Sequence, residues 1–407
     1  MQAMGTTALR TMVARYWRAG LWYGLLAAVF GGLLWYRLGT LTGGYAANEL
    51  ATLHASSSFS EIFNHPLNAP FTLVGRLLLS LDGHGLLMMR VTAAIFGLLM
   101  LSLFYWLLRH WHGQRAAVIG TILFGSSAWF LHTARLGTPD VLLFGTLTLT
   151  ACYLWLRRSQ HWLVVLTSFV VVAVLLYVPG MIWVIVLGVI WQWRAIDRVF
   201  MRNLWVVSVG CLLLLGALVP LGLAIYHSPE LGKVLAGLPP QGWPHIVETL
   251  QNLAAVPVTI FLHGPLDAEH WLGKLPLLDF FSMAMVVLGA YLYAKNFKLG
   301  RVYLVSGVIV IGALLISLGG AVTLTFFVPF LYILAAVGAD FMLQRWFVVF
   351  PRNVFAQAAG IGLLALAIAT SCWYSLRHYF VAWPDTPATK IVFAVPQQKL
   401  PSDTIKR

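Results

Sequence analysis

The sequence has little charge for its length. Only 10% of its 407 residues are Asp, Glu, Lys or Arg, and only 13 are acidic, whereas 60% are hydrophobic. Soluble domains carry about 25% charged residues, so an ordinary soluble protein is excluded, and the mean hydropathy of +0.84 indicates a polytopic membrane protein. The net charge of +13 does not indicate nucleic-acid binding, because basic residues gather at the ends of membrane spans.

Cysteines and short catalytic motifs are also scarce. The three cysteines, Cys152, Cys211 and Cys372, lie in apolar runs without CxxC or zinc spacing, and we interpret them as small core residues. The sequence contains no GxxxxGK[ST], HExxH or GxSxG motif, and no GxGxxG after a strand. These absences exclude the enzyme classes that depend on those motifs.

Long apolar runs are abundant instead. A membrane helix needs about 20 mainly apolar residues, and the sequence supplies about eleven such runs. We predict spans at residues 20–38, 86–108, 116–132, 139–156, 162–177, 179–193, 204–226, 279–295, 302–319, 322–343 and 354–375. Pro179 and Gly180 favour a hairpin between the fifth and sixth spans over one kinked span. The predicted fold is all-α, with one transmembrane domain over residues 1–375 and a short tail over residues 376–407.

The distribution of charge predicts the topology. With a cytoplasmic N-terminus and eleven spans, the arginines and lysines of the short loops gather on the cytoplasmic side, and the C-terminal tail is extracytoplasmic. Of the 13 acidic residues, only Asp197 and Asp340 then fall on the cytoplasmic side. The carboxylates are therefore gathered on the outer face, where we expect the chemistry.

The largest polar interval near the N-terminus is the first outer loop, residues 39–85. It predicts two amphipathic helices in the interface plane. The first covers residues 47–57, with Leu50, Leu53 and Ser57 on one side and Asn48, Glu49 and Thr52 elsewhere; the second follows Pro70, with Phe71, Val74, Leu78 and Leu81 on one face.

A second polar element, HTARLGTPD at residues 132–140, separates the third and fourth spans. Ionisable residues at this depth are costly unless they are paired or functional. Arg135 and Asp140 lie on either side of a Gly-Thr-Pro break, so we expect both to face one cavity at the outer membrane edge. The alternative is an Arg–Asp pair that caps a helix, with Thr138 as the N-cap.

The second large outer loop, residues 227–279, predicts a short amphipathic helix with Ile246, Leu250, Leu253 and Val256 on one face. Four residues after it could ligate a divalent metal, because imidazole and carboxylate are common ligands. They are His263, Asp267, Glu269 and His270. Their spacing matches no metal signature, and solvated loop residues are the commoner explanation, so no metal or other cofactor is required.

The order of these elements resembles the lipid-dependent GT-C glycosyltransferases, of the protein O-mannosyltransferase and aminoarabinose transferase types. The resemblance covers residues 20–343. It depends on the acid in the first outer loop, the HPLNAP element, the stretch SSAWFLHTARLGTPD and the YVPG turn. It implies an enzyme of the bacterial plasma membrane that acts on the extracytoplasmic side.

The resemblance also implies roles for individual residues. The general base falls on Glu49, with Glu61 as the fallback; the family has an Asp, often followed by Glu, where this sequence reads Asn48-Glu49. The second family acid matches Asp140, with Arg135 in the upstream basic position. A late Arg-Tyr pair near the lipid phosphate is replaced by GGAVTLTFFVPF, which contains Thr323 and Thr325 and no basic residue. Arg76, Arg90 or Lys274 would then contact the phosphate, or the donor differs from that of the family.

The chemistry of such a transfer needs these residue types. A phosphate leaving group requires positioned cations or a metal, and an acceptor hydroxyl requires a base at about 2.6–3.2 Å. Glu49, His65 and Arg76 above Arg135 and Asp140 meet those needs. We therefore expect a glycosyltransferase that uses a polyprenyl-phosphate-linked sugar and a protein, lipid or glycan acceptor. A lipid or solute transporter, or a catalytically inactive GT-C relative, are the alternatives.

Overall fold

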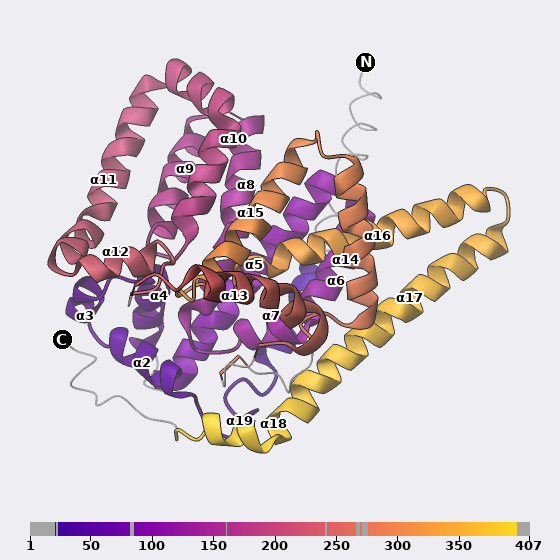
Figure 1. Ribbon diagram of the computed structural model, residues 1–407, viewed down its shortest axis with the longest axis horizontal. Coiled ribbons are helices and arrows are strands. Elements are labelled where there is room, and N and C mark those ends of the chain that lie inside the picture. The colour runs from indigo at the N-terminus through magenta and orange to yellow at the C-terminus, as the bar shows by residue number, and fades with distance from the viewer. Residues whose placement is uncertain are drawn as a thin grey trace, which may run out of the picture.

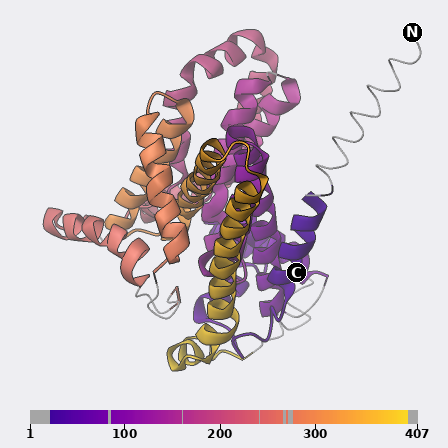
Figure 2. The same ribbon diagram turned by 90° about the vertical axis from the view of Figure 1, so that its right-hand side faces the viewer.

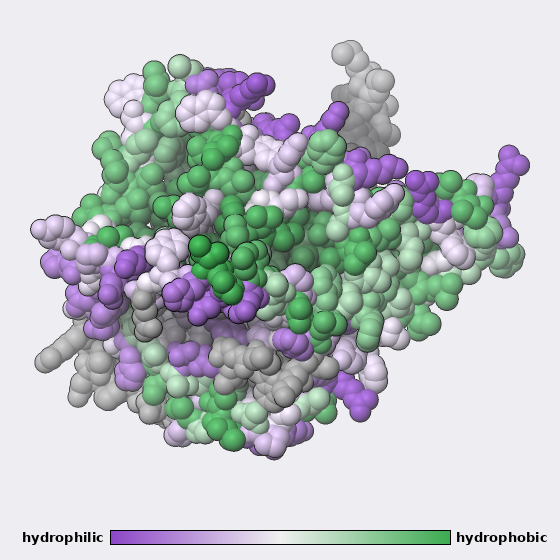
Figure 3. All heavy atoms as spheres, viewed as in Figure 1, coloured by the Kyte–Doolittle hydropathy of each residue, from purple (hydrophilic) through white to green (hydrophobic). Residues whose placement is uncertain are grey.

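The computed structural model describes Leu21 and residues 23–81, 85–159, 161–240, 242–265, 269–270 and 276–396. Within these residues the chain is helical, and its one β feature is an isolated antiparallel bridge between Tyr45 and Val395. The helices form a bundle, and Figure 3 shows a broad hydrophobic surface between two hydrophilic edges. This confirms the predicted all-α membrane fold. We call the end of the bundle that carries residues 39–81 the outer end, and the opposite end the inner end.

Seven helical stretches in the described residues are long and apolar enough to cross a membrane. They are Gly85–His112 (α5), Pro139–Arg158 (a 3₁₀ turn and α8), Leu204–His227 (α11), Ile246–His263 (α13 and a π turn), Gly300–Ser317 (α15), Val328–Val349 (α16) and Val354–Asp385 (α17, a π turn and α18). Four shorter apolar helices match further predicted spans: Tyr23–Trp35, Trp162–Leu175 (α9), Met181–Arg194 within α10 (Met181–Arg202) and Phe280–Lys295 (α14). The third predicted span is α6 (Gln114–Ser126). The total of eleven spans stays a prediction.

The predicted hairpin between the fifth and sixth spans is confirmed. α9 ends at Leu175 and α10 begins at Met181, and Gly180 between them has a φ of +75°. Figure 1 shows α8 to α11 running side by side. The turn is held at the outer end, because Asn68 of the first outer loop donates its backbone N–H to the carbonyl of Tyr177 (2.9 Å).

The first outer loop contains three helices: α2 (Ala47–Ala55), α3 (Phe59–Asn64) and α4 (Ala69–Leu79). Both predicted helices are present, but their buried faces differ from the prediction. In α2, Glu49 and Thr52 lie on the buried side with Leu53, because Glu49 pairs with a cation on α5. In α4, the buried face contains Phe71, Thr72, Gly75, Arg76 and Leu79, whereas Leu81 is exposed. α4 packs against α5 at Gly75, where a Cβ would lie 2.9 Å from the terminal methyl group of Met89, so a larger side chain would require Met89 to move.

The second outer loop contains α12 (Pro229–Leu235) and α13 (Ile246–Val258). Figures 1 and 2 show α13 lying across the bundle axis. It packs against the outer end of α15, where the side-chain amide of Asn252 donates to the carbonyl of Ser317 (3.1 Å). Of the predicted apolar face, Val256 is buried, while Ile246 and Leu250 are exposed, as suits a helix in the membrane interface.

The C-terminal part returns to the outer end. α17 (Val354–Arg377) diverges from the bundle, as Figures 1 and 2 show, and most of its surface is exposed. After it, α18 (Trp383–Asp385) and α19 (Pro387–Val392) pass beneath the first outer loop. Tyr45 and Val395 then exchange two backbone hydrogen bonds of 2.9 and 3.1 Å. The described part of the tail is therefore folded against the first outer loop.

Glycines allow α14 and α16 to pack in backbone contact. A Cβ added to Gly338 would lie 2.2 Å from the carbonyl oxygen of Met285, and one added to Gly289 would lie 2.0 Å from that of Leu334. Small residues at such contacts are a usual means of associating helices in membranes. We expect Gly338→Ala to lower the free energy of unfolding by about 1–3 kcal/mol, because backbone must move to admit the methyl group.

Thermal unfolding in detergent measures this effect, with Gly222→Ala on α11 as the matched control. No atom lies within 4 Å of a Cβ built on Gly222, so the control should be neutral or stabilise the helix by about 0.5–1 kcal/mol. Equal melting temperatures for Gly338→Ala and the wild type would show that the α14–α16 contact is looser than described.

Candidate active site

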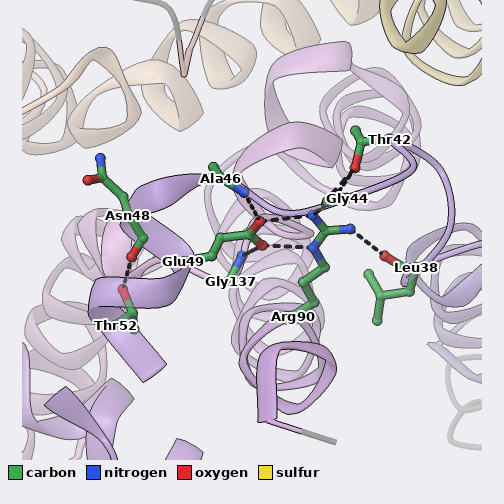
Figure 4. Close-up of polar contacts among 9 residues, drawn as sticks. All are labelled: Leu38, Thr42, Gly44, Ala46, Asn48, Glu49, Thr52, Arg90 and Gly137. Atoms are coloured by element: carbon green, nitrogen blue, oxygen red, sulfur yellow. Dashed lines mark hydrogen bonds and ion pairs between the residues drawn. The ribbon is translucent and has the colours of Figure 1, made fainter. Parts of the chain in front are cut away.

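A buried ion pair joins the first outer loop to α5. Glu49 lies in the first turn of α2, and Arg90 lies in the first turns of α5. Glu49 Oε1 accepts hydrogen bonds from Arg90 Nε (2.7 Å) and from the backbone N–H of Gly137 (2.8 Å). Oε2 accepts from Arg90 Nη2 and from the N–H of Ala46, both at 2.8 Å. Figure 4 shows the pair enclosed by these groups.

Arg90 uses its remaining donors on the same loop. Nη1 donates to the carbonyl of Leu38 (3.0 Å), and Nη2 donates to that of Gly44 (2.9 Å). The guanidinium lies 4.2 Å from the centroid of the Tyr45 ring, and burial raises the pKa of the Tyr45 hydroxyl, which the cation partly offsets. Glu49 is 0% exposed and Arg90 is 3% exposed. Neither the predicted base nor this predicted phosphate ligand faces a substrate cavity in this conformation.

The neighbouring residue, Asn48, points in the opposite direction. Residues adjacent in an α-helix are about 100° apart around its axis, and Figure 4 shows the Asn48 side chain directed away from the Glu49–Arg90 pair. Asn48 is exposed on the loop surface. Its side-chain amide donates to Glu269 Oε2 in the second outer loop. Asn48, the residue before Glu49, therefore contacts the carboxylate of Glu269, from a segment distant in the sequence.

His132 connects the same segment to the bundle. It lies in the short helix α7 (Ala128–Thr133), and its Nε2–H donates to the carbonyl of Glu269 (2.8 Å). Burial, with a smaller contribution from nearby His270, lowers the pKa of His132 to about 3. The ring is therefore neutral at pH 7, and it packs edge-on against Trp383 of α18.

Asp140 and His270 form the second contact between these segments. Asp140 lies at the start of the 3₁₀ turn Pro139–Phe144, and Thr138 occupies the predicted N-cap position. Asp140 Oδ2 accepts hydrogen bonds from Thr138 Oγ1 (3.0 Å) and His270 Nε2 (3.2 Å). The imidazole of His270 also stacks beside Trp129, with ring centroids 6.1 Å apart. Asp140 is thus placed to stabilise a positive charge on His270.

Arg135 does not share a cavity with Asp140, which corrects the prediction. Its Nη1 and Nη2 donate to the carbonyls of Leu33 (3.2 Å) and Tyr36 (2.6 Å), at the end of the first helix. The guanidinium lies over the rings of Tyr379 and Phe380, and burial lowers its pKa. No ion pair joins Arg135 to Asp140 among the described residues, so the alternative of a capping pair is not observed either.

Two cavities adjoin these groups. The first is just large enough for a water molecule and is lined by Arg90, His132, Arg135 and Tyr379, among others. The second has a volume of about 380 Å³ and lies between α13 and the outer end of α15. Its lining includes Trp129, Asn252, His270 and Thr323. The larger cavity is the one that can accept a substrate group.

Thr323 occupies the place where the resemblance implied a late basic residue. Its hydroxyl is buried and has no hydrogen-bond partner in the described structure, and it lines the larger cavity. The hydroxyl of Thr325 accepts a hydrogen bond from Trp129 Nε1 (3.1 Å). Thr325 therefore positions Trp129, whereas Thr323 retains a free polar group toward the cavity.

The remaining predicted site residues lie elsewhere. Glu61 and His65 are 3.6 Å apart on an exposed turn of α3. Arg76 is buried on α4, with its guanidinium 5.8 Å from the Phe59 ring. Lys274 and Asp267 lie outside the described residues. The structure does not bring Glu61, His65 or Arg76 into the cavity with His270.

The weak metal candidates do not converge. His263 Nδ1 contacts the carbonyl of Gly264 (3.0 Å), while Glu269 meets Asn48 and His270 meets Asp140. Across the described ranges, no three His, Cys, Asp or Glu side chains are grouped so that they could hold a metal ion.

Sequence reasoning did not assign His132, nor the contact between Asn48 and Glu269. His132 opens the stretch HTARLGTPD, but a single histidine at the end of an apolar span carries no periodic signal. Asn48 and Glu269 are 221 residues apart, so only the tertiary structure brings them together. The sequence feature that could have indicated this contact is Asn48-Glu49, at the place where the resemblance implies an Asp.

The sequence matches no protein-family model and no curated protein sequence. Solved structures do match. ArnT from Cupriavidus metallidurans bound to undecaprenyl phosphate gives a TM-score of 0.56 at 16% identity, over 91% of this chain and 76% of ArnT. The apo state of the same protein gives a TM-score of 0.50 at 17% identity, over 92% of this chain and 77% of ArnT.

The archaeal oligosaccharyltransferase AglB from Archaeoglobus fulgidus, in complex with an inhibitory peptide and a dolichol-phosphate, gives a TM-score of 0.56 at 13% identity. This chain is covered over 95% of its length but spans only 61% of AglB. At these identities the likeness concerns the fold. ArnT and AglB are both GT-C-fold glycosyltransferases, and this chain has a GT-C-like membrane fold, as its resemblance predicted.

Proposed function

We propose that this protein is an integral membrane glycosyltransferase that transfers a sugar from a polyprenyl-phosphate-linked donor to an acceptor hydroxyl at its outer end. The GT-C-like fold supports the class of reaction. The structures of its neighbours with undecaprenyl phosphate and with dolichol-phosphate support the class of donor. The cavity of about 380 Å³ lies beside α13, a helix with exposed apolar side chains, and suits a substrate that arrives from the lipid.

The convergence of Asn48, Asp140, Glu269 and His270 at one point carries this proposal. These residues come from three segments that are distant in the sequence, and two side-chain contacts join them. Of these residues His270 lines the larger cavity, and two carboxylates and an imidazole that are partly buried together are costly unless they are paired or functional. Perturbed polar groups at the edge of a cavity are a usual feature of active sites.

Glu269, rather than Glu49, is the proposed general base. Glu49 already accepts four hydrogen bonds and is enclosed. Glu269 lies beside Asn48, at the position where GT-C relatives have an aspartate. The acceptor oxygen would attack the anomeric carbon of the sugar while its proton passes to Glu269. The bond between that carbon and the phosphate oxygen would break, and polyprenyl phosphate would leave.

His270 is the proposed cation for the leaving phosphate. It is the one ionisable side chain in the described lining of the larger cavity, and Asp140 stabilises its protonated form by hydrogen bonding and charge. Thr323 adds a hydroxyl donor with no other partner. Lys274, four residues further along the loop, is a second proposed phosphate contact.

One observation favours a second candidate function, that of an inactive relative that binds lipid. Asn48 replaces the family aspartate, and an amide cannot act as a base. Sugar release from a labelled polyprenyl-phosphate donor, measured with purified protein in lipid nanodiscs, separates the two functions. Release at a rate above that of empty nanodiscs supports the enzyme, and its absence with binding intact supports the inactive relative.

Asp140→Asn is expected to lower transfer activity by about 100-fold, or about 2.7 kcal/mol of transition-state stabilisation. The substitution keeps the shape of the side chain but removes the charge that stabilises protonated His270. Asp385→Asn is the matched control, because Asp385 lies at the outer end, is exposed and pairs only loosely with Lys390 (3.9 Å). Equal activities of the two variants would remove Asp140 from the site.

Glu269→Gln is expected to reduce transfer by at least about 100-fold, because the amide cannot accept the proton. Adding Asn48→Asp to Glu269→Gln restores a carboxylate on the other side of the same contact and should recover at least about 10-fold. Single-turnover rates measure both effects, with Glu230→Gln on α12 as the control. Wild-type turnover by Glu269→Gln would contradict the assignment of the base.

Glu49→Gln should act on stability, because it leaves Arg90 buried without its counter-charge. Breaking a buried pair in this way costs about 3–5 kcal/mol, whereas removing both charges costs less. We therefore expect Glu49→Gln to melt at a lower temperature than Glu49→Gln with Arg90→Met. The fraction of Glu49→Gln that folds should retain transfer activity. An unchanged melting temperature with abolished transfer would instead make Glu49 the base.

A further inference from the structure

A second polar cavity lies at the inner end, far from the candidate active site. Its volume is about 460 Å³, and its lining includes Trp111, Arg157, Arg158, Trp191, Gln192 and Arg301. α5 and α8 run from the outer end and finish here, and α15 begins here at Gly300. The other end of α15, at Ser317, meets α13 beside the cavity of about 380 Å³ at the outer end. The two cavities are therefore separated by the length of α15.

The lining carries positive charge and no carboxylate. Three arginines contribute to it, and no Asp or Glu does. In the described part of the chain, neither Arg157 nor Arg158 lies within salt-bridge distance of an acidic side chain, and both are exposed. Like charges around one cavity repel each other, so a bound anion would lower the energy of this arrangement.

The geometry of the lining suits a phosphate group. Arginine presents a planar fork of donors that binds phosphate oxygens in pairs. Arg301 is held in place, because its Nη1 donates to the carbonyl of Trp111. Gln192, where α10 departs from helical geometry (φ −96°, ψ 15°), adds a side-chain amide. The positive end of the α15 dipole at Gly300 adds to the potential of the arginines.

The apolar part of the lining favours a lipid over a soluble anion. Trp111 and Trp191 lie at the inner edge of the bundle, the depth at which tryptophans meet lipid headgroups. Leu154, Leu299 and Leu304 complete the lining. The positive-inside rule explains why single arginines occur at the inner ends of membrane helices. It does not account for three of them sharing one cavity with two tryptophans, whereas basic pockets between membrane helices bind anionic headgroups.

We propose that this inner cavity binds the phosphate headgroup of an anionic phospholipid from the adjacent leaflet. Arg157 and Arg158 bind the phosphate from the open side, and Arg301 binds it from within the bundle. The site does not depend on the proposed transferase activity. The bound lipid would join α5, α8, α10 and α15 at their inner ends, so its first measurable effect is on thermal stability.

The test measures melting temperatures of the full-length protein in a neutral detergent with added phosphatidylglycerol, phosphatidylcholine or glycerol 3-phosphate. Phosphatidylglycerol should raise the wild-type melting temperature by about 3 °C or more relative to phosphatidylcholine, because a ligand that binds only the folded state stabilises it. The double variant Arg157→Gln/Arg158→Gln should lose at least half of this shift.

The matched control is Arg194→Gln/Arg198→Gln on α10, which removes the same charge from exposed residues outside the lining. It should keep the full shift. The proposal is overturned by an equal loss of shift in both double variants, since that would be a general surface-charge effect. It is also overturned if phosphatidylglycerol produces no shift, or if glycerol 3-phosphate produces the same shift at the same concentration.

Discussion

The buried pair between Glu49 and Arg90 fixes the outer end of the molecule. Placing two charges out of water costs several kcal/mol per ion unless further hydrogen bonds satisfy them. Here Glu49 accepts from Ala46 and Gly137 as well as from Arg90, and Arg90 donates to Leu38 and Gly44. One ion pair thus joins the end of the first span, the start of α2, α5 and the segment that leads to Asp140.

The position of the candidate site follows from this anchor. Glu49 is held inward, and the preceding residue, Asn48, binds Glu269 of the second outer loop instead. Gly137 is bound to Glu49, which places Asp140, three residues later, at the same level. The second outer loop then has two fixed partners, Asn48 for Glu269 and Asp140 for His270. The neutral His132 binds the backbone carbonyl of Glu269, between these two side-chain contacts.

The sequence predicted those features that depend on local pattern. Apolar length indicated the spans, Pro179 and Gly180 indicated the turn between α9 and α10, and Pro70 indicated the start of α4. The sequence did not predict which side of α2 is buried, because periodicity counts a glutamate as polar and cannot know that Arg90 neutralises it. Periodicity likewise placed Phe71, Val74, Leu78 and Leu81 on one face of the second helix, whereas the packing of α4 against α5 brings the smaller Gly75 to the contact.

The contact partners of Asp140 and Arg135 could not be predicted from the sequence. Asp140 lies at the outer end and binds His270, which lines the larger cavity, but its expected partner, Arg135, caps the first helix instead. An arginine near an aspartate in the sequence suggests an ion pair, yet this guanidinium contacts two backbone carbonyls and two aromatic rings, and its buried Nε has no hydrogen-bond partner. Such competition between partners is tertiary, and no spacing rule expresses it.

Two buried arginines at the outer end make structural contacts, which leaves a particular electrostatic arrangement at the cavity. Arg90 and Arg135 are buried against carbonyls and rings, and the cation in the described lining is an imidazole, His270. An arginine stays protonated at neutral pH, whereas an imidazole titrates near it, so the proposed attraction of His270 for a phosphate depends on a neighbour that stabilises the charged form. Asp140 is that neighbour. If His270 meets the donor phosphate as proposed, Asp140, the acid that the family resemblance marks, supports the positive charge that the missing late arginine would have supplied.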